Sequence, residues 1–150
     1  MKEYINIKDF RLSWRWLDPK HTVLPPEVLE RIRPLSPQAT EQISTNIMDF
    51  CRDTVEFLRI EENETTASAL AKLPIKDETE IIVSWDSNTA VNTTWGIFRN
   101  YWDDFCYPSS DDVSNWPETR EWLLCYFHEE VLIYKKFQQS NPPDPRSAGR

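Results

Sequence analysis

Apolar residues recur at helical spacing most clearly between residues 37 and 59. Ser36 can cap a helix, and Pro37 is suited to its first position. The positions that would form one buried face are three or four residues apart, as in an amphipathic helix. They are Ala39, Ile43, Ile47, Phe50, Cys51, Val55 and Leu58. We therefore predict one long helix over residues 37–59.

Other segments have weaker or shorter patterns. In "LPPEVLERI" a proline begins a short helix, which Pro34 ends, and residues 66–73 form another helix. Between residues 10 and 16, apolar side chains alternate with polar ones, which is typical of a half-buried strand. A helix that begins at Asp9 is the alternative for this segment.

Four segments have the composition of strands. "TEIIVSWD" reads as a buried strand, and "AVNTT" as its short antiparallel partner. "EWLLCYF" and "VLIYKKF" form a hairpin joined by "HEE". We therefore predict an α+β fold in which an antiparallel sheet of about four strands has helices packed on one face. Residues 1–139 form this single domain, and residues 140–150 form a flexible polar tail.

The segment 94–112 combines aromatic and acidic residues. Thr94 can cap a helix that runs to Phe105, with its aromatic residues on one side, Asp103 on the flank and Asp104 pointing to solvent. The aromatic residues are Trp95, Phe98, Tyr101, Trp102 and Phe105. Pro108 ends the helix, and "PSSDDVSN" reads as a loop.

Composition excludes several functions. The net charge of -8 and the pI near 4.8 disfavour nucleic acid and anionic membranes as partners. With two glycines the chain has no phosphate-binding loop, and we expect no cofactor. The three cysteines are too widely spaced for a structural zinc site, and we expect reduced thiols. The absence of a signal-peptide pattern predicts a cytoplasmic location.

The negative charge is concentrated between residues 103 and 130, where eight acidic residues and one basic residue give a local net charge of -7. Carboxylates beside aromatic residues suit an interface with a basic protein, because charge steers the partner and the aromatic side chains anchor it. We predict a partner-binding surface formed by Asp103, Asp104, Asp111, Asp112, Trp116, Glu129 and Glu130.

Two kinds of chemistry are the alternatives. A cysteine hydrolase would need Cys106, His128 and one of Asp111 or Asp112, although a small buried cysteine and a turn histidine explain the same residues. A small hydrolase could instead hold Mg, Mn or Fe through Asp111, Asp112 and His128, because oxygen ligands with one imidazole suit these metals. A purely structural subunit is the third reading.

The order Trp-Asp, Ala-Val-x-Thr-x-Trp, Tyr-Trp-Asp-Asp-Phe and Ser-Asp-Asp within residues 80–136 resembles a group of short bacterial proteins of unknown function. This resemblance implies a bacterial origin and assigns no catalytic residue. In its acidic, tryptophan-rich character the chain is also similar to immunity proteins that neutralise bacterial toxins. That likeness implies a non-enzymatic module that binds and blocks a basic protein.

Overall fold

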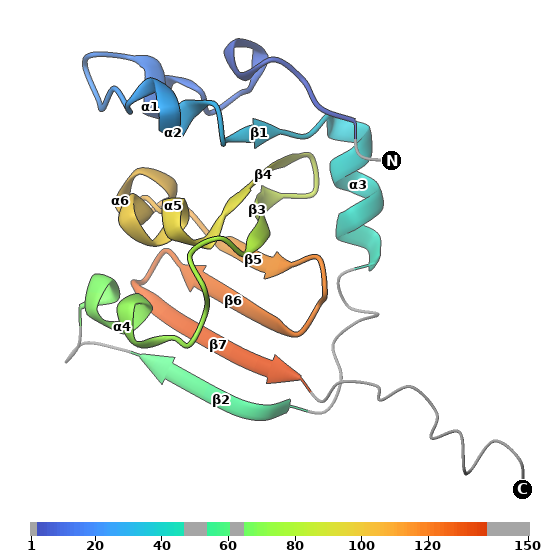
Figure 1. Cartoon of the computed structure of the whole chain (residues 1–150), viewed down its shortest axis with the longest axis vertical. Coiled ribbons are helices and arrows are strands. Elements are labelled where there is room, and N and C mark those ends of the chain that lie inside the picture. The colour runs from blue at the N-terminus through green and yellow to red at the C-terminus, as the bar shows by residue number, and fades with distance from the viewer. Residues whose placement is uncertain (1–2, 47–53, 61–64, 138–150) are drawn as a thin grey trace, which may run out of the picture.

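The computed structural model describes residues 3–46, 54–60 and 65–137, and within them it shows an α+β fold built on one antiparallel sheet (Figure 1). Seven strands of this described part lie in the order β1-β4-β3-β5-β6-β7-β2, and every neighbouring pair is antiparallel. The strands are β1 (Arg33–Pro34), β2 (Thr54–Ile60), β3 (Glu80–Asp86), β4 (Thr89–Thr94), β5 (Val113–Pro117), β6 (Trp122–Phe127) and β7 (Val131–Phe137).

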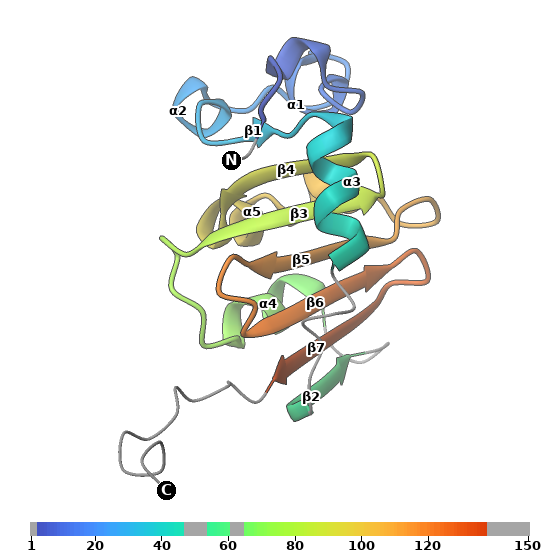
Figure 2. The same ribbon diagram turned by 90° about the vertical axis from the view of Figure 1, so that its right-hand side faces the viewer.

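Helices lie on both faces of the sheet, so the prediction of helices on one face is wrong (Figure 2). The reason is that both sides of the central strands are apolar: Ile81 and Val83 face one cluster, whereas Ile82 faces the other. One face is covered by α3 and the other by α1, α4, α5 and α6. The helices are α1 (Trp14–Leu17), α2 (Pro26–Leu29), α3 (Pro37–Asn46), α4 (Thr66–Lys72), α5 (Trp95–Asn100) and α6 (Trp102–Phe105).

The sheet has more strands than the four that the sequence predicted. The predictions of β3, β4, β6 and β7 are confirmed, as are the short helices α2 and α4. The strands β1 and β5 were not predicted, and β2 occupies residues that we assigned to a helix.

The predicted helix over residues 37–59 is correct only in its first part. The helix α3 ends at Asn46, residues 47–53 lie outside the described part, and β2 then pairs with β7 from Thr54 to Ile60. The aromatic and β-branched residues of β2 favour a strand once a neighbouring strand is present. Pairing with the sheet therefore overrides the helical spacing of this segment.

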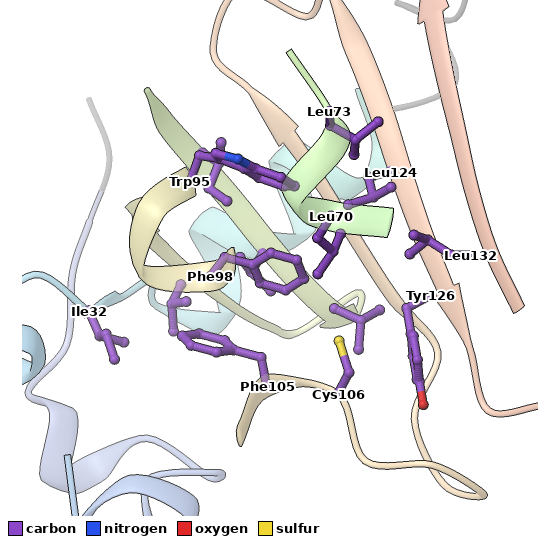
Figure 3. Packing of buried hydrophobic residues seen from close by; sticks show 14 of the residues in the cluster. Ile32, Leu70, Leu73, Trp95, Phe98, Phe105, Cys106, Leu124, Tyr126 and Leu132 are labelled. Atoms are coloured by element: carbon purple, nitrogen blue, oxygen red, sulfur yellow. The ribbon is translucent and has the colours of Figure 1, made fainter. Parts of the chain in front are cut away.

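The helix predicted between Thr94 and Phe105 is divided in two. Thr94 caps α5 as predicted, with its hydroxyl accepting a hydrogen bond from the amide of Ile97. At Tyr101 the backbone leaves the helical region, with φ -122° and ψ 27°, and α6 follows. Phe98 and Phe105 still point into the main cluster, together with the Cys106 thiol (Figure 3).

Residues 10–16 do not form the predicted strand. A 3-10 helix (Ile7–Asp9) precedes α1, and Trp16 stacks on Phe10 with ring centroids 5.7 Å apart. The Trp16 indole N–H donates to the carbonyl of Asp104 at 3.0 Å. Phe10, Leu12, Arg15 and Trp16 are buried without strand pairing, and Trp14 is exposed.

Trp95→Ala should lower the free energy of unfolding by about 3–5 kcal/mol, because Trp95 is fully buried and the change leaves a cavity. Trp102→Ala should cost clearly less, since Trp102 is only partly buried. Urea unfolding of both variants measures the difference. Equal losses would contradict the packing described for α5 and α6.

Candidate functional site

A buried ion pair lies at the centre of the candidate site. The Arg15 guanidinium in α1 contacts both carboxylate oxygens of Asp111, at 2.5 and 3.1 Å. The Tyr107 amide and the Ser110 hydroxyl also donate to this carboxylate, at 2.9 and 3.3 Å. The side chains of Arg15 and Asp111 are only 6% and 9% exposed. Asp111 therefore has a structural role, because it links α1 to the loop that precedes β5.

The guanidinium of Arg15 is also enclosed by aromatic rings. Its central carbon lies 3.9 Å from the centre of the Tyr107 ring and 5.3 Å from that of Trp14. One of its nitrogens lies 3.4 Å from the carbonyl of Phe105, at the end of α6. Stacking on Tyr107 and the bidentate carboxylate contact both depend on the planar shape of arginine.

Asp112 forms a second, exposed group of contacts. Its carboxylate accepts hydrogen bonds from the backbone amide of His128 at 3.0 Å and contacts Nδ1 of that ring at 2.9 Å. The Nε2 atom of His128 lies 2.8 Å from the Glu129 carboxylate. Both ring nitrogens of His128 are thus engaged by carboxylates at the turn between β6 and β7.

These contacts change the pKa values of both groups. The hydrogen bond that the His128 ring donates to Asp112, together with the charge of Glu129, raises the pKa of His128 above its ordinary value. The same hydrogen bonds lower the pKa of Asp112. Asp112 thus stabilises the fold above its ordinary pKa and loses that effect as the pH falls through the lowered pKa. His128 stabilises it below its ordinary pKa and loses that effect as the pH rises through the raised pKa.

The predicted metal ligands do not all converge. Asp112 and His128 are in contact, but Asp111 is occupied by Arg15. Within the described residues, no three histidine, cysteine, aspartate or glutamate side chains are grouped to hold a metal ion. The Cys106 thiol is buried, and burial first of all raises its pKa well above its usual range, which keeps it protonated.

The carboxylates of the predicted site other than Asp111 come from three segments. Asp103 is exposed and Asp104 half-buried in α6, Asp112 is exposed in the following loop, and Glu129 and Glu130 are exposed in the β6–β7 turn. We call these five residues the acidic end. Asp104 is not on the solvent side as predicted: burial raises its pKa, while a hydrogen bond from Thr22 opposes that effect.

Contacts between the loop and the turn bring these segments together. The Ser109 amide donates to the carbonyl of His128 at 2.9 Å, which fixes the loop beside the turn. Burial raises the pKa of Tyr107, the Arg15 charge opposes this rise, and the charges of Asp104, Asp111 and Asp103 add to it. In Tyr126, burial and then nearby negative charges, Glu130 among them, raise the pKa to about 12.

Trp116 lies elsewhere, although it was predicted to anchor the partner. It is 4% exposed and belongs to the cluster beneath α3, on the face of the sheet opposite the main cluster. The structure therefore places Trp116 in the core and away from the acidic end.

Sequence reasoning missed three aromatic residues near the acidic end. Trp14 is 38% exposed, and its ring centre lies 4.6 Å from that of His21 and 5.8 Å from that of Tyr107. We call these three residues the aromatic rim. In the sequence, Trp14 was the residue that could have indicated this surface, but its place in an alternating pattern suggested a half-buried strand.

Asp111→Ala should lower the free energy of unfolding by about 3–5 kcal/mol, because it leaves the buried Arg15 charge unpaired. Asp112→Ala at the next position is the matched control and should cost about 1 kcal/mol or less, because Asp112 is exposed. Urea unfolding compares the two. A larger loss for Asp112 would contradict the structural role of Asp111.

Asp112→Asn should lower the pKa of His128 towards its ordinary value, because the amide cannot supply the charge that favours imidazolium. An NMR titration of the His128 ring protons measures this shift. An unchanged curve for His128 would mean that Asp112 does not contact it in solution.

Comparisons with known proteins identify no relative of this chain. The chain matches no family model, no curated protein and no solved structure. In the described part, no helix has the length and apolar character needed to cross a membrane. The functional argument therefore depends on the residues of the acidic end and the aromatic rim.

Proposed function

We propose that this chain is a non-enzymatic protein-binding module of immunity type, which engages a basic protein through its acidic end. The observation that carries the proposal is the convergence of Asp103, Asp104, Asp112, Glu129 and Glu130 from three segments. Arg15 is the basic side chain that these segments enclose, and its charge is already paired with Asp111. Asp103 and Glu130 are exposed to solvent, whereas Asp112 and Glu129 also contact the His128 ring.

Such a surface acts mainly through electrostatic complementarity. Exposed carboxylates steer a basic partner into position and repel acidic proteins, and they raise the association rate more than the final affinity. At physiological salt the Debye length is about 8 Å, so only groups close to the interface contribute strongly. Binding by the acidic end should therefore weaken as the salt concentration rises.

The test is to look for an open reading frame next to the gene that encodes a basic protein, and to titrate that protein calorimetrically with this chain. Asp103→Lys combined with Glu130→Lys should weaken binding by about tenfold or more and reduce its salt dependence, because both exposed carboxylates become repulsive. The matched control is Glu78→Lys with Glu80→Lys, which changes the net charge equally. The pairing of Ile81 with Pro117 places Glu80 at the other end of the sheet from Asp112.

The two double variants give a clear decision. Weakened binding in the first and nearly unchanged binding in the second would support an interface at the acidic end. Equal effects would mean that overall charge and not the acidic end governs the association. Unchanged affinity in both, or no binding by the unaltered chain, would overturn the proposal.

A further inference from the structure

The aromatic rim is an exposed apolar surface that the acidic end alone does not explain. Among the described residues, Trp14 and Val23 are large apolar side chains exposed to solvent near α1, at 38% and 58%. Trp14 forms its tilted contact with His21, which is also exposed, and an edge contact with Tyr107. Tryptophan and tyrosine side chains of this kind are the usual anchors of protein interfaces.

The rim lies directly beside carboxylates. Thr22, which follows His21, hydrogen-bonds to the carboxyl group of Asp104. The charges of Asp104 and Asp103 both act on the Tyr107 ring hydroxyl. A ligand on the rim would therefore contact aromatic rings on one side and meet negative charge on the other.

The chemistry of this surface favours an arginine side chain. A guanidinium group stacks on aromatic rings and can bind a carboxylate through two parallel hydrogen bonds, whereas a lysine ammonium is a compact charge without a planar face. The protein already shows this combination internally, because Arg15 stacks 3.9 Å from the Tyr107 ring centre while it pairs with Asp111. Trp14 and Asp103 are both exposed and both neighbour Tyr107, so a ring and a carboxylate are available to solvent in this region.

We propose that the aromatic rim is the anchor site for an arginine side chain of the basic partner, with Trp14 as the stacking platform and the exposed Asp103 as the acceptor. This inference rests on the proposed function and specifies which residue type of the partner is recognised. The docking position extends from the acidic end to α1, so that Trp14 takes the anchoring role first expected of Trp116.

The test uses a capped arginine-rich peptide and a lysine-rich peptide of equal length as probes. In NMR spectra, the indole resonance of Trp14, assigned with Trp14→Phe, and the amides of Asp103 and Asp104 should shift together and saturate with the arginine peptide. Trp14→Leu should weaken binding by about tenfold and remove the preference for arginine over lysine. Phe57→Leu, at an exposed aromatic residue of β2, is the control and should change neither.

A third variant tests whether weaker binding could result from a loss of folded protein. Asp103→Asn alters an exposed carboxylate and should weaken the arginine peptide while the melting temperature stays unchanged. Saturable shifts at Asp112, Glu129 and Glu130 without Trp14 would overturn the inference and leave the acidic end as the binding site. Equal affinity for the two peptides, or no saturable shift, would also overturn it. The calorimetric titration separately decides whether the acidic end binds a basic protein at all.

Discussion

The buried pair between Arg15 and Asp111 is the interaction on which the arrangement of the candidate site depends. It joins two segments 96 residues apart in the sequence, and both side chains are largely buried. Asp111 also receives the amide of Tyr107, so the same carboxylate shapes the loop that leads into β5. Since a buried charge without its partner is strongly destabilising, the two segments are held in one relative position.

This constraint places the exposed groups around it. With Arg15 fixed, its neighbour Trp14 is directed outwards against Tyr107, and Trp16 is directed inwards onto α6. The other neighbour of the pair, Asp112, is left exposed and contacts His128. Residues on the inner side of this ion pair stabilise the fold. Residues on its outer side belong to the acidic end and the aromatic rim, and we propose that these two groups form the binding surface.

Strong local patterns made about half of the sheet predictable. The strands β3, β6 and β7 are long apolar runs, and Thr94 has the sequence signature of a helix cap, so local chemistry was sufficient there. The strand β5 was read as a loop because serine, asparagine and proline are typical of turns. Its position is set by its neighbours: Asn115 is paired with Val83 and Leu124 in the middle of the sheet.

The sequence predicted the negative charge of the candidate site but not the role of each residue in it. The clustering of carboxylates between residues 103 and 130 is visible in the sequence. The sequence does not show, however, that Asp111 is buried while its neighbour Asp112 is exposed. Only the partner of Asp111, on a distant segment, makes it structural. The burial of Trp116 has the same origin, because the cluster beneath α3 is formed from segments far apart in the chain.

The most direct test of this account is a double-mutant cycle between Arg15 and Asp111, measured by urea unfolding. Arg15→Met and Asp111→Leu each leave one buried charge unpaired, whereas the double variant leaves none. We predict that the double variant is more stable than the sum of the single losses implies, with a coupling energy of about 2–3 kcal/mol. Additive losses, within about 0.5 kcal/mol, would show that the two residues act independently and would contradict the account.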